Sequence, residues 1–146
     1  MSRYVGVDFD QQAIKWNMES LPHEFEFICS NFFNCSELKN NEFDAVISLD
    51  VIEHIAPTME DKFCELISSS LRTDGIAAIG TPSIMMSPYT REENKIAHIN
   101  LYDQRRLYEL MSKYFRNIFI FNMNDEIVNV SFAPWHAISL QFVVIR

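Results

Sequence analysis

Glycine is scarce in this chain: there are three glycines, Gly6, Gly75 and Gly80, among 146 residues. No two of them lie close enough in sequence to build a loop whose backbone amides pack against a phosphate group. The sequence therefore excludes a self-contained Walker loop and a glycine fingerprint for dinucleotides.

Cysteines and long hydrophobic runs are also few. The three cysteines, Cys29, Cys35 and Cys64, are an odd number without the spacing of zinc ligands, which argues against a disulfide framework and a structural zinc site. We expect small buried residues or idle thiols. No apolar run approaches the roughly 18 residues that cross a bilayer, and residues 1–4 lack the apolar stretch of a secretory signal. We expect a cytoplasmic protein with no membrane partner.

Basic residues are fewer than acidic ones: the chain has 12 Lys and Arg and 20 Asp and Glu, which gives a net charge of -8. A protein that binds phosphate backbones needs a basic surface, so we expect no nucleic-acid partner. Hydrophobic residues make up 48% and charged residues 22%, which is typical of a soluble globular protein. The length suits one core, and we expect a single domain over residues 1–146.

Short apolar runs alternate with amphipathic stretches along the chain, which indicates an α/β fold. The run at 43–49 is nearly continuous in apolar residues, which predicts a parallel strand buried on both faces. No helix pattern separates the last two strands, so we expect them to pair antiparallel. The expected strands are 4–7, 25–29, 43–49, 76–79, 117–123 and 136–145.

Three helices are expected between these strands. Asp10 is the expected N-cap of the first helix, Thr58 begins the second with acidic residues in its first turn, and Asp103 caps the third. Asp74–Gly75 predicts a turn. Residues 83–99 form the longest irregular stretch, and such loops are often lids or binding loops.

Polar residues follow several of the expected parallel strands, where ligands of such sheets bind. Asp8 ends the first strand, and its carboxylate suits the two hydroxyls of a ribose; the alternative is an N-cap or a solvated turn residue. Asn31 suits hydrogen bonding to an adenine amino group with the Phe32 ring beside the base, and the alternative is a turn followed by a core aromatic. Ser48, Leu49 and Asp50 end the third strand.

Acidic and imidazole groups gather in the segment from Asp50 to His54. With Glu53 between them, these groups suit acid–base chemistry, or they cap the following helix. We expect no metal site, because no second His or Cys stands at ligand spacing. His98 lies in the long loop, where it is either a surface histidine or a catalytic one.

Three segments, 4–10, 43–55 and 71–76, resemble class I S-adenosylmethionine-dependent methyltransferases in their order and spacing. The closest branch in this resemblance is the UbiG-like group, which acts on small molecules, and residues 43–55 are the most specific part. The resemblance covers essentially the whole chain. It implies a Rossmann-like sheet with helices on both faces, an antiparallel last strand, and S-adenosylmethionine bound at the strand tips.

The resemblance also implies roles for individual residues. Asp8 holds the cofactor ribose with Phe9 beside it, Asn31 replaces the usual aspartate at the adenine, and Phe32 lies next to the base. Two further groups complete the expected site: Ser48, Leu49 and Asp50 along the cofactor, and His98 near the acceptor.

The chain departs from this family at its N-terminus. In the family, a strand and a Gly-rich turn precede the strand that ends in Asp8, and that strand lies between the strands ending at Asp8 and at Leu49. Its absence leaves two rows of unpaired backbone groups, each costing on the order of 1–3 kcal/mol when buried. The flanking strands then pair with each other, or a second subunit completes the sheet, or the chain is an N-terminally truncated fragment.

The expected reaction is methyl transfer from S-adenosylmethionine to an oxygen or nitrogen of a small molecule or sugar, with His98 or Asp50 removing a proton. The alternative is a non-catalytic remnant of the fold that acts in an oligomer or as a partner-binding module. A nicotinamide-dependent enzyme is disfavoured, because the segment 43–55 has no place in it.

Overall fold

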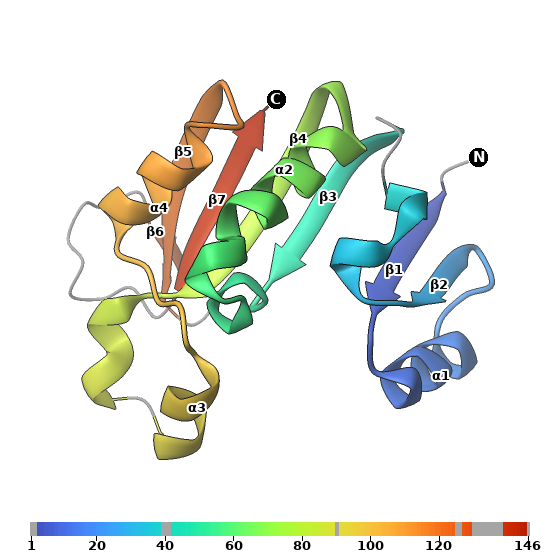
Figure 1. The fold of residues 1–146 in the computed structure, drawn as a ribbon, viewed down its shortest axis with the longest axis horizontal. Helices are drawn as coiled ribbons and strands as arrows, with labels where there is room; N and C mark the ends of the chain where they lie inside the picture. Colours follow the sequence, from blue (N-terminus) through green and yellow to red (C-terminus); the bar gives the residue numbers. More distant parts are fainter. Residues whose placement is uncertain (1–2, 39–41, 90, 125–126, 130–138, 146) are drawn as a thin grey trace. The chain divides into compact units, whose positions relative to one another are not determined.

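The computed structural model describes residues 3–38, 42–89, 91–124, 127–129 and 139–145. These residues divide into two compact units, Met1–Lys39 and Asn40–Arg146, and each is described by itself (Figure 1). The single domain expected over the whole chain stays a prediction. None of the described helices has the length and apolar character needed to cross a membrane.

The first unit is a β–α–β arrangement. Strands β1 (Tyr4–Asp8) and β2 (Phe25–Cys29) run parallel, and helix α1 (Gln11–Ser20) connects them. Asp8 stands opposite Cys29 in the register, so the carboxyl ends of both strands lie at the same edge of this two-stranded sheet. Two short 3-10 helices follow, η1 (Phe32–Asn34) and η2 (Ser36–Leu38).

Two local features fix this unit. The Asp10 carboxylate accepts the backbone N–H groups of Gln12 and Ala13, which confirms the expected cap of α1. A Cβ atom at Gly6 would lie 2.8 Å from Cδ1 of Phe27, so the absence of a side chain lets that ring pack against β1.

The second unit contains a five-stranded sheet in the order β3-β4-β7-β5-β6. Strands β3 and β4 are parallel, whereas β7 runs antiparallel to both β4 and β5. The expected pair at the end of the chain is β5 with β7; residues 136–138 of the expected last strand lie outside the described residues. The main elements are β3 (Phe43–Leu49), α2 (Glu60–Ser70), β4 (Leu71–Pro82), α3 (Glu92–Ala97), α4 (Gln104–Met111), β5 (Asn117–Asn124), β6 (Ile127–Asn129) and β7 (Ser139–Ile145). Three 3-10 helices, η3 (Ile52–His54), η4 (Pro57–Met59) and η5 (Ile84–Tyr89), lie between them.

Helices α2 and α4 cover one face of this sheet (Figure 1). Their apolar residues are buried against it, and Sγ of Cys64 lies 4.0 Å from Sδ of Met111 where the two helices meet. Burying one such apolar side chain stabilises a fold by about 1.5–3 kcal/mol. The buried residues of the two helices include Phe63, Cys64, Leu66, Ile67, Leu107, Leu110 and Met111.

On the opposite face of the same sheet, apolar side chains of β3, β4 and β5 are exposed. Ile47 and Leu49 of β3 are 73% and 50% exposed, and the register places Ile76 and Phe119 on the same face, also exposed. The expectation that residues 43–49 are buried on both faces is therefore wrong in the described structure. The reason is that α2 and α4 both pack on the other face.

Two boundaries differ from the sequence expectations. The N-cap of α2 is Met59 without a side-chain hydrogen bond, rather than Thr58, because η4 leads directly into the helix. Asp74–Gly75 lies within β4 instead of forming a separate turn. Leu71 already pairs with Phe43, and the register then shifts, so residues 72–75 are accommodated as an irregularity of the strand.

Strands β1 and β3 are each the end strand of their own sheet. The two strands belong to different units, and the three arrangements expected for a missing central strand stay predictions. Each of the two strands has one edge without a partner strand in the described part of the chain.

Candidate functional site

The carboxyl edge of the first unit carries Asp8 and Phe9. Both are exposed, and Phe9 is 82% exposed. One oxygen of Asp8, Oδ1, accepts the backbone N–H of Asp10 at 2.8 Å, which orients the carboxylate at the strand tip. A carboxylate has about four lone-pair sites, so this one retains accepting capacity toward solvent.

Asn31 and Phe32 lie at the same edge. Asn31 follows β2 by two residues and caps η1, with its Oδ1 accepting the N–H of Phe33 at 2.9 Å. The Phe32 ring is half-buried and packs edge-on against Phe33, with 5.9 Å between the ring centroids. The structure therefore brings the four residues expected to hold ribose and adenine to one edge of the β1–β2 sheet.

The first unit also has a hollow of about 670 Å³, and none of these four residues lines it. Its walls are formed by α1 and the end of β2. The lining residues are Asp10, Gln11, Gln12, Ile14, Lys15, Met18 and Cys29.

The carboxyl end of β3 carries the remaining expected cofactor residues. Ser48 is half-buried, whereas Leu49 and Asp50 are exposed. Asp50 donates its N–H to the carbonyl of Gly80 at 3.0 Å, which extends the parallel ladder by one residue. Its φ of 53° lies in the left-handed region, which costs a non-glycine residue on the order of 1–3 kcal/mol. The chain turns there from the strand into η3.

Glu53 follows this turn and is fully buried, at 0% exposure. Its Oε2 accepts the hydroxyl of Thr81 at 3.0 Å, from the end of β4. Its Oε1 has no hydrogen-bond partner among the described residues. Burial raises the pKa of Glu53, the hydrogen bond from Thr81 opposes this, and the charge of Asp50 adds to the rise.

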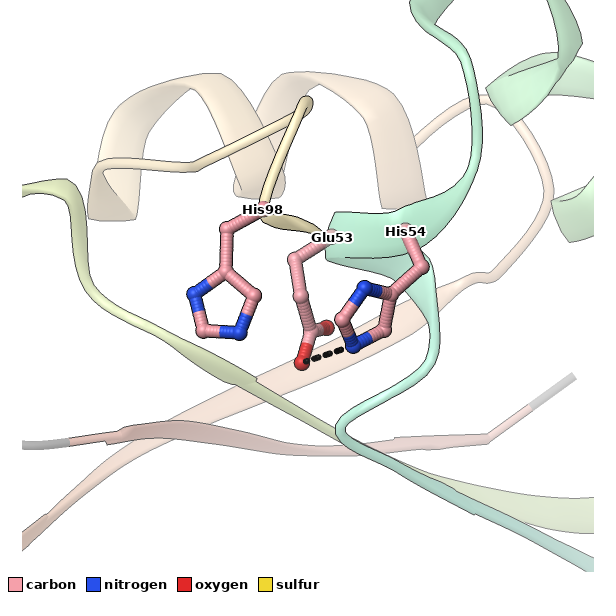
Figure 2. A group of neighbouring side chains, drawn as sticks. All are labelled: Glu53, His54 and His98. Atoms are coloured by element: carbon pink, nitrogen blue, oxygen red, sulfur yellow. Dashed lines mark ion pairs between the residues drawn. The ribbon is translucent and has the colours of Figure 1, made fainter. Parts of the chain in front are cut away.

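His54 lies beside this carboxylate. Its Nδ1 is 3.0 Å from the carbonyl oxygen of Ala97, and a carbonyl only accepts, so Nδ1 carries the proton. The other ring nitrogen, Nε2, faces Oε1 of Glu53 at 3.8 Å (Figure 2). The histidine side chain is 46% exposed, whereas that of Glu53 is fully buried.

His98 joins these two residues from the end of α3 (Figure 2). Its ring centroid is 5.0 Å from that of His54, with the rings edge to face. One ligand atom from each of Glu53, His54 and His98 can be chosen so that all lie within 4.8 Å of one another. The structure thus places the expected catalytic residue His98 in a three-residue cluster with Glu53 and His54.

Backbone contacts hold His98 in this position. The carbonyl of Ala97, directly before it, accepts from the His54 ring, and the N–H of Asn100, two residues after it, donates to the carbonyl of Glu53 at 3.0 Å. Both sides of His98 are therefore attached to the η3 segment.

A buried polar network supports the segment after His98. The Glu60 carboxylate at the start of α2 accepts from Tyr102 at 2.7 Å, from Asn100 at 3.0 Å and from Arg106 at 2.7 Å. Arg106 also donates to the carbonyl of Leu101 at 2.7 Å, and its guanidinium lies 4.2 Å from the centroid of the Tyr102 ring. This network connects α2, the loop before α4 and α4 itself.

Comparison with known proteins identifies the family. A family profile described as a methyltransferase domain matches residues 1–79, which is more than half of the chain. The chain belongs to the methyltransferase domain family. The match includes β1, β2 and β3 and extends into β4 of the methyltransferase domain. No curated protein matches the chain in a search of such proteins.

Solved structures share the fold of this methyltransferase domain. An S-adenosylmethionine-dependent methyltransferase from Archaeoglobus fulgidus is 15% identical, with a TM-score of 0.74 over 97% of this chain and 75% of that one. A Thermotoga maritima methyltransferase, described as a possible histamine N-methyltransferase, is 14% identical, with a TM-score of 0.76 over 97% of this chain and 72% of that one. The expected α/β methyltransferase fold is confirmed.

A third solved structure contains ligands. A Burkholderia thailandensis N-methyltransferase with bound 1,6-didemethyltoxoflavin and S-adenosylhomocysteine is 14% identical, with a TM-score of 0.66 over 99% of this chain and 61% of that one. The first of these structures is described as S-adenosylmethionine-dependent, and the third contains S-adenosylhomocysteine. At these identities, the structures support the fold and do not assign an acceptor.

Sequence reasoning missed the association of His98 with Glu53 and His54. Only one histidine stands close to Glu53 in the sequence, and the second arrives from 44 positions beyond His54, at the end of α3. The one available signal is the density of acidic and imidazole groups in residues 50–54. The pairing of that segment with the long loop is a tertiary contact without a sequence motif.

Proposed function

We propose that this chain binds S-adenosylmethionine and transfers its methyl group to an oxygen or nitrogen of a small-molecule acceptor. The observation that carries the proposal is the position of Asp8, an exposed carboxylate at the carboxyl end of a parallel strand in a chain of the methyltransferase domain family. The residues present fit this cofactor, because Asp8 keeps free accepting capacity and Asn31 and Phe32 lie at the same edge.

In this proposal, each edge residue has a separate task. Asp8 accepts the two ribose hydroxyls while the Asp10 amide holds its Oδ1 in place. Asn31, whose Oδ1 has a second lone pair beside the one used by Phe33, contacts the adenine amino group. The exposed ring of Phe9 and the half-buried ring of Phe32 give the base an apolar surface.

The second unit supplies the residues proposed to act on the acceptor. Asp50 or His98 removes the proton of the acceptor as its oxygen or nitrogen becomes methylated. Ser48 and Leu49, which lie at the end of β3 directly before Asp50, are proposed as contacts of the cofactor. The bound cofactor supplies an activated methyl group on its sulfonium. The protein's main contribution is alignment of the two reactants, which can lower a barrier by about 7–11 kcal/mol.

A small molecule is the proposed acceptor class. The net charge of -8 disfavours a nucleic acid, and residues 43–55 resemble the UbiG-like branch. The Burkholderia thailandensis structure, described with bound 1,6-didemethyltoxoflavin, is consistent with such an acceptor.

The second candidate function is a partner-binding or oligomeric module without catalysis. The exposed apolar face of the five-stranded sheet, with Ile47, Leu49, Ile76 and Phe119, favours it, because exposed apolar patches commonly mark interaction surfaces. A second copy of the chain that completes the sheet belongs to the same proposal. Sedimentation over a range of protein concentrations tests for a dimer.

Isothermal titration of the full chain with S-adenosylmethionine and S-adenosylhomocysteine tests the proposed function. We expect saturable binding that weakens at least tenfold in Asp8→Ala, because the ribose loses its acceptors. Asp8→Asn keeps the oxygen that accepts the Asp10 amide and separates loss of charge from loss of local structure. Glu24→Ala, which removes another exposed carboxylate of the same unit, is the matched control and retains binding.

Two results contradict the proposal. No binding at millimolar ligand removes the enzyme function for this chain and leaves the partner-binding module. Equal affinity in the wild type and in Asp8→Ala shows that the ribose is bound elsewhere.

A further inference from the structure

We propose that Glu53, His54 and His98 bind a divalent transition-metal ion, a site separate from the proposed cofactor contacts. The set consists of one carboxylate oxygen and two imidazole nitrogens, which suits first-row ions such as Zn²⁺, Mn²⁺ and Fe²⁺. All three side chains belong to the second unit, and the inference does not depend on methyl transfer.

The first argument is the unsatisfied oxygen of Glu53. A fully buried carboxylate with one oxygen unpaired is costly, because desolvation is not offset by a hydrogen bond at that atom. The hydroxyl of Thr81 fixes the other oxygen, so Oε1 points into the cluster (Figure 2). A cation at this place would supply the missing partner.

The second argument is the tautomer of His54. Its Nδ1 proton is used by the Ala97 carbonyl, so in the neutral ring Nε2 presents a lone pair to Oε1 of Glu53 across 3.8 Å. Two acceptors that face each other need a positive charge between them, either a proton or a metal ion. A ring N–H bonded to a backbone carbonyl, with the opposite nitrogen free, is the arrangement that metal-binding histidines adopt.

The third argument is the fixed position of His98. Because Ala97 and Asn100 are bonded to the η3 segment on either side of it, the third ligand is held near the other two before any ion binds. The ligand atoms lie within 4.8 Å of one another, whereas ligands of one ion at 2.0–2.2 Å lie about 3 Å apart. Small side-chain rotations of the partly exposed histidines close this difference.

Three protein ligands leave coordination positions free. The His54 side chain is 46% exposed, so solvent reaches the cluster, and water or an oxygen of a ligand can fill these positions. A histidine bound to an ion no longer accepts a proton. Within the proposed function, this inference therefore assigns proton removal to Asp50.

The competing explanation is a structural contact, in which a proton on Nε2 of His54 pairs with Glu53 and His98 only packs against the His54 ring. The two explanations differ in the role of His98. A metal site requires its imidazole nitrogen, whereas a packing contact has no use for that nitrogen.

The test is titration of the chelator-treated full chain with ZnCl₂ and MnCl₂, without cofactor, by isothermal titration and by thermal unfolding. We expect one ion per chain and a rise in unfolding temperature with ion concentration. Affinity is expected to fall at least tenfold in Glu53→Gln, which replaces the charged carboxylate by a neutral amide, and in His98→Asn, which removes the imidazole. His23→Asn, which alters an exposed histidine of the first unit, is the matched control and keeps wild-type affinity.

Substitution with Co²⁺ adds a readout independent of stability, because its visible absorption bands report the ligand set. We expect these bands to change in His98→Asn, a variant that leaves the hydrogen-bonded side chains of Glu53 and Thr81 unaltered. The proposal is overturned if the wild type shows no saturable binding of either ion. It is equally overturned if His98→Asn binds both ions with the affinity of the wild type. Because no cofactor is present, neither result bears on methyl transfer.

Discussion

Tyr102→Phe isolates one hydroxyl of the buried network that supports the His98 segment. Tyr102 is fully buried, its hydroxyl donates to Oε2 of Glu60 at 2.7 Å, and it accepts from Nδ2 of Asn100 at 2.5 Å. A hydrogen bond to a charged group contributes about 1.5–3 kcal/mol. Glu60 still accepts from Asn100 and Arg106 in the variant, and the ring keeps its packing, so we expect a loss near the lower end, about 1.5–2 kcal/mol.

The assay is urea unfolding followed by far-ultraviolet circular dichroism, which reports the second unit as well as the first. We expect a lower unfolding midpoint with an unchanged dependence on urea, and a fall of about 5 °C in unfolding temperature. Tyr102→Ala removes the ring as well and is expected to cost about 3–5 kcal/mol.

Tyr108→Phe is the matched control, because this tyrosine is on α4 and is 49% exposed. Its stability should stay within about 0.5 kcal/mol of the wild type. If Tyr102→Phe is as stable as Tyr108→Phe, the hydroxyl does not support the network, and the reasoning about the His98 segment is refuted.

Two further predictions concern thiols and pH. Cys29 is exposed, whereas Cys35 and Cys64 are buried, and burial raises the pKa of Cys64 to about 12. We therefore expect one thiol per native chain to react quickly with a disulfide reagent, and all three to react after denaturation. Fast reaction of two thiols in the native chain contradicts this prediction. The ion pair with Lys113, at 2.8 Å, lowers the pKa of Asp61. The small stabilisation of the fold by this ion pair is therefore present at pH values above the ordinary pKa of aspartate, and it is lost as the pH falls through the lowered pKa of Asp61. Urea midpoints of the wild type and Asp61→Asn should therefore converge in acid, and a difference that grows on acidification excludes the assignment.

The sequence predicts those elements that local chemistry determines. Asp10 and Asp103 cap their helices as expected, since a short acidic side chain before an amphipathic run satisfies the free amides of the first turn. The bounds of β2 and β3 also match, because apolar runs with β-branched and aromatic residues favour strands.

Tertiary pairing accounts for what the sequence does not predict. Asp74–Gly75 is typical of a turn, yet pairing of Leu71 with Phe43 draws these residues into β4. The exposure of Ile47 follows from the placement of both covering helices on the other face of the sheet, which no local pattern encodes.

The candidate site likewise contains residues that local sequence identifies and a tertiary contact that it does not. Strand ends can be located from sequence, so Asp8, Asn31 and Asp50 could be named as candidates, and their roles remain predictions. The association of Glu53 with His98 depends on the hydrogen bond between the Asn100 amide and the Glu53 carbonyl, a contact between residues 47 positions apart. Neither spacing nor composition indicates such a contact.

The most direct test of S-adenosyl binding at the strand tips is a nuclear magnetic resonance titration of the ¹⁵N-labelled chain with S-adenosylhomocysteine. The account predicts that the amide signals of Phe9, Asn31 and Phe32 in the first unit shift together and saturate with a single affinity. Shifts that do not saturate, or no shifts at millimolar ligand, would contradict it.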